Sequence, residues 1–147
     1  MAGSKKDGFE TAILNHIFCN AAIAAIGDAN GVLGSSTAGS LYIALFTANP
    51  TDSAQGTEAA YTNYARVAVA RSSGGWTVAS GQAVNAAAIT FPTCGATGAT
   101  ITGFAICKAG TTGVDDAIYW GELGSSLAVS NGITPEFAAG QLTITED

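Results

Sequence analysis

The sequence predicts a mainly β chain, in which an antiparallel β-sandwich of about seven to eight strands follows one N-terminal α-helix. Three observations predict this class. Apolar residues recur at helical spacing only near the N-terminus, later segments alternate apolar and polar residues, and Gly, Pro and Asn separate those segments. The length of 147 residues fits one folded domain. We therefore expect a flexible leader at residues 1–8 and a single domain at residues 9–147.

The helix is expected at residues 9–26. Phe9, Ile13, Ile17 and Ala21 follow the i, i+4, i+8 spacing that places side chains on one face of a helix. Gly27 comes directly afterwards, and glycine is common just beyond the C-terminus of a helix. The pattern therefore predicts one helix whose apolar stripe is buried.

The predicted sandwich occupies residues 41–147. Its first strand is the apolar segment LYIALFT at residues 41–47, and the sequence Asn49-Pro50-Thr51-Asp52 that follows is typical of a turn. Alternation with a period of two, or a short apolar run between turn residues, predicts the other strands. These strands are expected at residues 64–71, 82–91, 100–108, 117–123, 125–130 and 141–145.

Charged residues are scarce, which bears on the kind of surface that this chain presents. They make up 11% of the sequence, whereas about 25% is usual for globular proteins. A β-rich chain with so little charge is expected to cover much of its surface with other protein, as an assembly subunit does. The net charge of −6 disfavours nucleic acid as a partner. No apolar run approaches the roughly 18 residues typical of a membrane helix, so we expect no membrane association.

The sequence contains no recognisable catalytic constellation, and we expect a protein without enzymatic activity and without a cofactor. The single histidine, His16, lies in the predicted helix, where a solvated or hydrogen-bonded side chain is expected. No G-x-S-x-G motif is present, so a Ser–His–Asp triad has no support. Most acidic residues fall in predicted loops, which disfavours a catalytic carboxylate pair.

The cysteines are the remaining candidates for metal binding or redox chemistry. Cys19, Cys94 and Cys107 lack the close pairing of zinc ligands, so we expect no metal site. Their expected role is that of small buried hydrophobic residues. A cross-strand disulfide between Cys94 and Cys107, or an intermolecular disulfide from the odd cysteine, is the alternative.

Aromatic residues and one arginine are the candidates for a protein interface. Tyr119 and Trp120 are adjacent in a predicted strand, so they face opposite sides of the sheet, and one of them is expected to be exposed or at an interface. Arg66 needs a carboxylate or carbonyl partner wherever it is buried, and we expect its role to be structural. A sugar-binding aromatic platform is an alternative use of the aromatic side chains. The candidate interface comprises Phe9, Tyr42, Tyr64, Arg66, Trp76, Tyr119 and Trp120.

Three stretches carry a resemblance to a known family. They are LYIALFTANPTD at residues 41–52, YARV at residues 64–67, and IYWGEL at residues 118–123 leading to AGQLTI at residues 139–144. This pattern resembles a family of small β-rich structural proteins of tailed bacteriophages, whose members are called decoration, head-fibre or minor tail proteins. The resemblance implies a component of the virion and no catalytic residues.

The function expected from these observations is that of a capsid decoration protein, which binds and stabilises the phage head. The expected partners are other virion proteins, above all the major capsid protein, together with further copies of the chain, for which a trimer suits shell geometry. The expected location is the virion, after synthesis in the cytoplasm of the host bacterium. A tail-fibre, collar or baseplate component is the alternative, in which the loops at residues 48–62 and 109–116 contact receptor or sugar. A carbohydrate-binding module is a third hypothesis.

Overall fold

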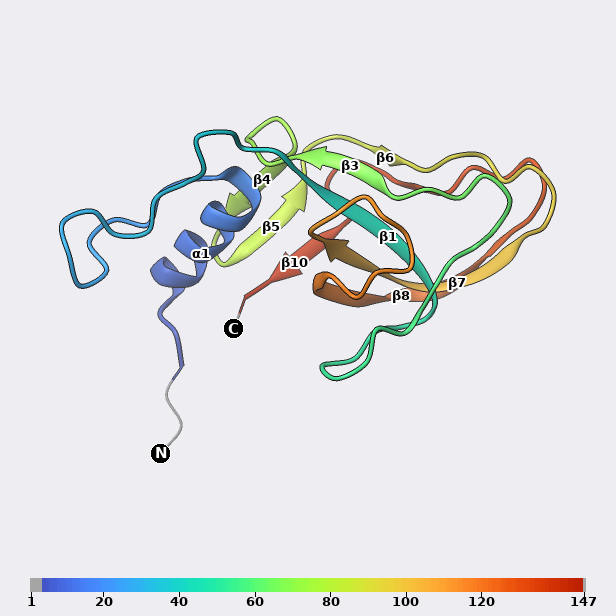
Figure 1. Ribbon diagram of the computed structural model, residues 1–147, viewed down its shortest axis with the longest axis horizontal. Helices are drawn as coiled ribbons and strands as arrows, with labels where there is room; N and C mark the ends of the chain where they lie inside the picture. Colours follow the sequence, from blue (N-terminus) through green and yellow to red (C-terminus); the bar gives the residue numbers. More distant parts are fainter. Residues whose placement is uncertain (1–3, 147) are drawn as a thin grey trace. The chain divides into compact units, whose positions relative to one another are not determined.

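The computed structural model describes residues 4–146 and confirms a mainly β chain with antiparallel sheets and one N-terminal helix (Figure 1). The described part contains ten strands, more than the seven to eight expected, because three of them have only two residues. The contacts divide these residues into two compact units. Unit 1 contains residues 4–40, 70–88 and 137–146, and unit 2 contains residues 41–69 and 89–136.

Helix α1 spans Asp7–Cys19, so the prediction of a helix at residues 9–26 was wrong at both ends. The helix ends because Asn20 adopts a left-handed conformation, with φ of 57°. The side chain of Asn20 also exchanges two hydrogen bonds with the backbone of Ser35, at 2.7 and 2.8 Å. The first helical turn includes Asp7 and Gly8, which we had assigned to the leader, and the leader residues 1–3 lie outside the described residues.

Unit 1 packs α1 against the three-stranded sheet β10-β5-β4, which consists of β10 (Thr143–Thr145), β5 (Gln82–Asn85) and β4 (Trp76–Ala79). The helix buries Leu14 and Phe18. The rings of Phe18 and Trp76 pack edge to face, with their centroids 4.6 Å apart. Arg71 donates hydrogen bonds to the helix carbonyl groups of His16 and Ile17, at 2.7 and 2.6 Å. The C-terminal end of α1 is therefore stabilised by a cation.

The prediction for the single histidine can be checked at this end of the helix. His16 Nδ1 is hydrogen-bonded to the carbonyl oxygen of Ala21 at 2.8 Å, as expected for a histidine in the helix. The helix itself has 13 residues, and no helix in the described part of the chain is long and apolar enough to cross a membrane.

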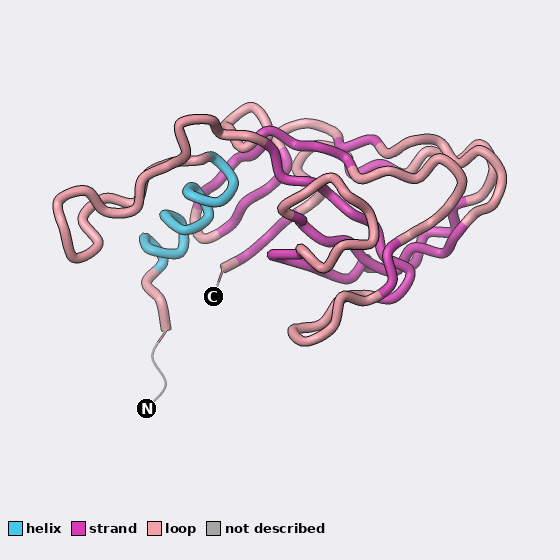
Figure 2. Tube along the Cα trace, in the orientation of Figure 1, coloured by secondary structure: helices cyan, strands magenta, loops and turns pink. Residues whose placement is uncertain are grey.

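After α1 the chain makes a long excursion without helix or strand, visible as the pink segment that extends from the cyan helix in Figure 2. We call residues 21–33 the arm. Two backbone hydrogen bonds of 2.8 Å between Ile23 and Val32 close its base. At its tip the Asp28 carboxylate accepts hydrogen bonds from the N–H groups of Asn30 and Gly31, which fixes the expected turn.

Unit 2 contains a five-stranded antiparallel sheet in the order β2-β1-β7-β8, with β3 also paired to β1. The central strands bury side chains on both faces, and their register places Ala44 opposite Ala105 and Phe46 opposite Gly103. Two further strands, β6 and β9, form a separate ladder. The strands are β1 (Ser40–Ala48), β2 (Thr57–Glu58), β3 (Val67–Ala70), β6 (Ile89–Thr90), β7 (Ala99–Cys107), β8 (Ala117–Val129) and β9 (Glu136–Phe137).

Candidate functional site

A groove of about 410 Å³ opens in unit 2, where the turn between β1 and β2 lies near the beginning of β8. One side is the tip of the β1–β2 hairpin, and the other comes from the residues that enter β8. The two sides are far apart in the sequence, so the groove exists only once the sheet has formed. Its lining residues are Pro50, Thr51, Asp52, Ser53, Ala54, Asp115, Ala117, Ile118 and Trp120.

The hairpin side of the groove has a defined backbone. Thr51 and Ala54 exchange two backbone hydrogen bonds, at 2.9 and 3.3 Å, which confirms the turn expected from the sequence. Behind this turn, the Asn49 side chain lies over Gly103 of β7 and accepts a hydrogen bond from the Thr102 hydroxyl at 3.0 Å. A side chain at position 103 would overlap the Asn49 amide oxygen, so this approach requires glycine.

The strand side of the groove presents an indole ring. Trp120 lies opposite Ala105 in the β7–β8 ladder, and 41% of its surface is exposed. Ile118, also exposed, lines the groove beside it. The neighbouring Tyr119 is half-buried, in agreement with the expectation that one of the two adjacent aromatic residues is exposed. Tryptophan is usually well buried, so the exposure of this indole is unusual.

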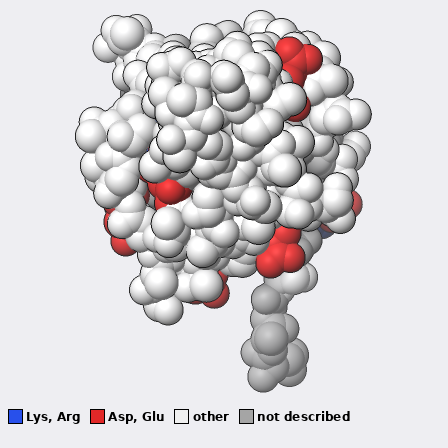
Figure 3. All heavy atoms as spheres, turned by 90° about the vertical axis from the view of Figure 1, so that its right-hand side faces the viewer, with Lys and Arg blue, Asp and Glu red and all other residues white. Residues whose placement is uncertain are grey.

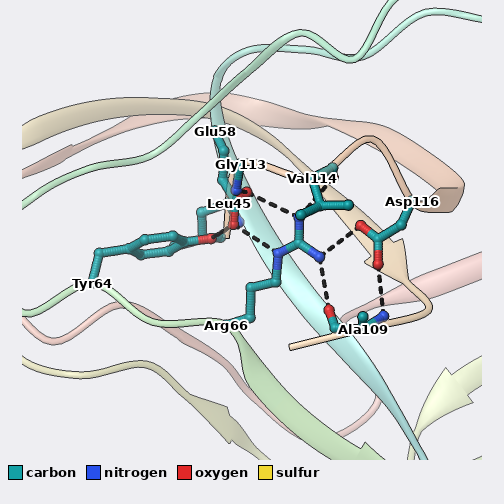
Figure 4. Close-up of polar contacts among 8 residues, drawn as sticks. All are labelled: Leu45, Glu58, Tyr64, Arg66, Ala109, Gly113, Val114 and Asp116. Atoms are coloured by element: carbon teal, nitrogen blue, oxygen red, sulfur yellow. Dashed lines mark hydrogen bonds and ion pairs between the residues drawn. The ribbon is translucent and has the colours of Figure 1, made fainter. Parts of the chain in front are cut away.

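A buried cluster of charges centred on Arg66 supports both sides of the groove (Figure 4). Arg66 contacts the Glu58 carboxylate at two points, Nε to Oε1 at 2.9 Å and Nη2 to Oε2 at 3.0 Å. Its Nη1 donates to Asp116 Oδ1 at 2.7 Å, and the side chains of all three residues are at most 7% exposed. The guanidinium also donates to the carbonyl groups of Ala109 and Val114. Arg66 is therefore bonded to both partner types expected for it, carboxylate and carbonyl groups.

The two carboxylates of the cluster are themselves anchored to backbone. Glu58 Oε2 accepts a hydrogen bond from the N–H of Gly113 at 2.6 Å, and Asp116 Oδ2 accepts one from the N–H of Ala109 at 2.6 Å. Glu58 Oε1 also accepts a hydrogen bond from the hydroxyl group of Tyr64 at 2.8 Å. Glu58 belongs to the returning strand of the hairpin, whereas Gly113 and Asp116 belong to the segment that enters β8. The cluster therefore ties the two sides of the groove to each other.

The charge state of the cluster follows from its contacts. Burial alone would raise the pKa of Glu58, but hydrogen bonds from Arg66, Gly113 and Tyr64 lower this pKa below its ordinary value. Burial would lower the pKa of Arg66, but the hydrogen bonds to Glu58 and Asp116 raise it. Burial raises the pKa of Tyr64, and the Glu58 carboxylate adds to this effect. Glu58 and Arg66 thus stabilise each other in their charged forms.

A family model described as "Podophage GP4 fiber I protein gp80" matches residues 5–145. The chain belongs to this family. No curated protein matches the sequence significantly.

Membership of this fibre family makes the chain a structural component of a bacteriophage virion. The match covers α1, all the described strands and the groove, because it extends from residue 5 to residue 145. The resemblance to phage structural proteins is therefore confirmed at the level of the virion.

The seven residues of the candidate interface are divided between the two units. Phe9 and Trp76 belong to unit 1, and the other five belong to unit 2. Trp76 and Arg66 are buried, at 1% and 8% exposure, so these two side chains contribute to the interior. Phe9 and Trp120 are exposed, whereas the remaining residues are half-buried, namely Tyr42, Tyr64 and Tyr119.

The cysteines have the environment expected of small buried residues. Cys94 and Cys107 are buried, Cys19 is half-buried, and all three are free thiols, so the alternative of a Cys94–Cys107 disulfide is not observed. Burial, reinforced by the nearby Asp116, raises the pKa of Cys107 to about 12 even though Arg66 opposes the shift. Within residues 4–146, no three His, Cys, Asp or Glu side chains gather as a set of metal ligands.

The groove was missed by the sequence reasoning, although one signal for it was present. The loops at residues 48–62 and 109–116 had been named as candidate contact loops, and both supply lining residues. Asp52 and Asp115 are among the acidic residues in predicted loops, and no local pattern of the sequence places them near Trp120. Their proximity depends on the pairing of β1 with β7 and of β7 with β8.

Proposed function

We propose that the chain is a fibre component of a bacteriophage virion and is held in the particle by contacts with neighbouring subunits. The family match over residues 5–145 carries this proposal, because the matching family is described as a fibre protein. The fold supports it, since the buried polar groups of unit 2 are used to fix loops and strands. A fibre subunit needs such a fixed surface for contact and does not need a reactive centre.

The arm supplies a surface suited to contact with another subunit. Its apolar side chains Ile26, Val32 and Leu33 are 44%, 42% and 68% exposed. Apolar side chains gathered on one projecting segment are costly to leave in water and are typical of protein interfaces. We therefore assign the arm to subunit contact, with another virion protein or a second copy of the chain as its partner.

The sparse charge of the chain is consistent with this role. On the face drawn in Figure 3, most of the surface is uncharged, and the charges that are visible are chiefly separate Asp and Glu side chains. A surface with few charges loses little solvation free energy when another protein covers it.

Capsid decoration is the second candidate function, and the same low charge favours it, because a decoration protein also covers much of its surface with neighbouring subunits. The two functions differ in position and number. A decoration protein occupies repeated positions over the capsid, with the major capsid protein as its partner, whereas a fibre component is present in few copies at the site of fibre attachment.

Imaging of phage particles that carry this chain tests the proposal. Cryo-electron microscopy of wild-type particles is expected to place the density of the chain in fibres, in few copies. Density repeated over the whole capsid would contradict the fibre assignment and favour decoration.

A variant in the arm tests the contact surface separately. Leu33→Asp is expected to leave the chain folded but to reduce its incorporation into particles. Ile133→Asp, which alters an exposed apolar residue outside the arm, is the matched control and is expected to be incorporated normally. Equal incorporation of both variants would exclude the arm as the contact.

A further inference from the structure

The groove of unit 2 combines an exposed aromatic ring with carboxylate and hydroxyl groups. Trp120 and Ile118 supply the apolar part of its lining, and Asp52, Asp115 and Thr51 supply polar groups. The volume of about 410 Å³ lies in the range typical of small-molecule sites. A mixture of one flat aromatic surface and several hydrogen-bonding groups matches a ligand that is itself apolar on its ring faces and polar at its edges.

The indole ring is available to such a ligand. Trp120 is 41% exposed, although most residues of the neighbouring strand β7 are buried. Its side chain makes no hydrogen bond to any other described residue. The face of an indole is electron-rich, so it attracts weakly positive C–H groups that lie over it. The ring face of a pyranose presents C–H groups of this kind.

The carboxylates in the groove have unused acceptor capacity. Asp52 and Asp115 are exposed, and neither side chain is hydrogen-bonded or ion-paired within residues 4–146. This distinguishes them from Glu58 and Asp116, whose oxygen atoms are bonded to Arg66 and to backbone N–H groups. Ionised carboxylates form strong hydrogen bonds with hydroxyl donors. They also repel anions, so the groove disfavours acidic ligands.

We propose that this groove binds neutral saccharides, with the Trp120 indole stacked on one pyranose ring and the carboxylates of Asp52 and Asp115 accepting hydrogen bonds from its hydroxyl groups. The ligand class is a hexose or N-acetylhexosamine oligosaccharide without carboxylate or sulfate groups. The inference rests on the proposed function for its biological setting, because a virion fibre can meet the saccharide surface of a bacterial cell. The binding itself is a property of the isolated chain.

The buried cluster gives the groove a fixed shape before the ligand arrives. Arg66 links Glu58 of the hairpin to Asp116, which directly follows the groove residue Asp115. The close contact of the Asn49 side chain with Gly103 of β7 also fixes the base of the hairpin. A site whose loops are already ordered loses less conformational entropy on binding, which favours affinity.

A glycan microarray probed with the full chain, followed by titration of the strongest neutral oligosaccharide, tests the proposal. Trp120→Ala is expected to weaken binding by about tenfold or more, because it removes the stacking surface. Asp52→Asn and Asp115→Asn are each expected to weaken it by about threefold to tenfold. Leu127→Ala is the matched control, since Leu127 is 39% exposed on the same strand but does not line the groove, and it is expected to bind like wild type.

Circular dichroism of each variant shows that the fold is retained, and acrylamide quenching adds a second measurement. Trp76 is buried and Trp120 is exposed, so a ligand in the groove is expected to protect the quenchable part of the fluorescence. Three results would overturn the proposal: no binding of any neutral glycan by the wild-type chain, equal binding by Trp120→Ala, or preferential binding of acidic glycans. None of these results bears on the location of the chain in the virion, which imaging decides independently.

Discussion

Arg66 and Glu58 form a two-point ion pair inside unit 2, with donor–acceptor distances of 2.9 and 3.0 Å and side chains that are 0% and 5% exposed. Asp116 completes the cluster from the opposite side of the guanidinium, at 2.7 Å. One cation is thus shared by two carboxylates from distant parts of the sequence. The fold of this region depends on that cation, because its loss would leave both carboxylates buried without a counter-charge.

The first prediction concerns Arg66 itself. Arg66→Ala is expected to lower the free energy of unfolding by about 3–5 kcal/mol, which is typical when one partner of a buried ion pair is removed. Arg66→Lys is expected to retain only part of the stability that Arg66→Ala loses, because an ammonium group cannot reproduce the two-point contact with Glu58. Urea unfolding monitored by circular dichroism measures both effects. Equal stability of Arg66→Lys and wild type would contradict the role assigned to the planar guanidinium.

The second prediction concerns acidic pH. The pKa of Glu58 is lowered in the folded chain, whereas an unfolded glutamate titrates near about pH 4.3. The stabilisation from Glu58 is therefore present above this value and is lost as the pH falls through the folded pKa. We expect the free energy of unfolding to decrease below about pH 4.3 and to decrease less steeply in Glu58→Gln. Unfolding curves at a series of acidic pH values measure the slope, and parallel slopes for the two proteins would refute the assignment.

The third prediction concerns the close approach of Asn49 to β7. Gly103→Ala places a methyl group against the Asn49 amide oxygen and the carbonyl oxygen of Gly121, so we expect a loss of about 1–3 kcal/mol in stability. Gly124→Ala is the matched control on β8, because a methyl group at that position meets no atom within 4 Å. Thermal unfolding of both variants gives the comparison. A Gly103→Ala variant as stable as the control would show that the hairpin base can move freely.

The fourth prediction concerns the end of α1. Arg71 donates hydrogen bonds to the carbonyl groups of His16, Ile17 and Ala38. Arg71→Leu leaves these carbonyl groups without their donor and is expected to cost about 2–3 kcal/mol of stability. Trp76, whose ring contacts Phe18 of the helix, is a fluorescent probe of unit 1. Its fluorescence is expected to show that unit 1 of Arg71→Leu unfolds under milder denaturing conditions than unit 1 of wild type. Unchanged unfolding of this probe would contradict the capping role of Arg71.

The fifth prediction concerns thiol reactivity. Burial raises the pKa of Cys107 to about 12 and also raises the pKa of Cys19. Because the thiolate is the reactive form, we expect Cys107 to remain unmodified by a thiol reagent at pH 8 in the native chain and Cys19 to react slowly. All three cysteines are expected to react quickly in urea. Rapid native modification of Cys107, located by mass spectrometry, would show that the core of unit 2 opens readily.

The strongest local patterns in the sequence predicted the central strands well. The segments at residues 41–47 and 100–108 correspond closely to β1 and β7, because both strands are mostly buried and rich in apolar residues. The predicted strands at residues 117–123 and 125–130 proved to be one strand, β8. The Gly124 that appeared to separate them lies within a shift of the β7–β8 register.

Other boundaries depended on contacts that no local pattern contains. The predicted strand at residues 82–91 is divided, because the buried Asn85 side chain bonds to the backbone of Ala87, Ala138 and Leu142. The helix was predicted too long because the pairing of Asn20 with Ser35 is also nonlocal. The same limitation applies to the site. The need of Arg66 for an anionic partner was predictable from its chemistry, but Glu58 and Asp116 were identifiable only from the fold.

The groove separates the residues that shape it from the residues that face outward. Glu58, Arg66, Asn49 and Gly103 fix the β1–β2 hairpin from within, whereas the side chains at positions 51–54 are exposed. Substitutions at the tip therefore leave the anchoring contacts intact. Natural selection can change the chemistry of this surface one residue at a time without first having to rebuild the sheet, so a phage lineage can alter what this surface contacts while it keeps the same folded subunit.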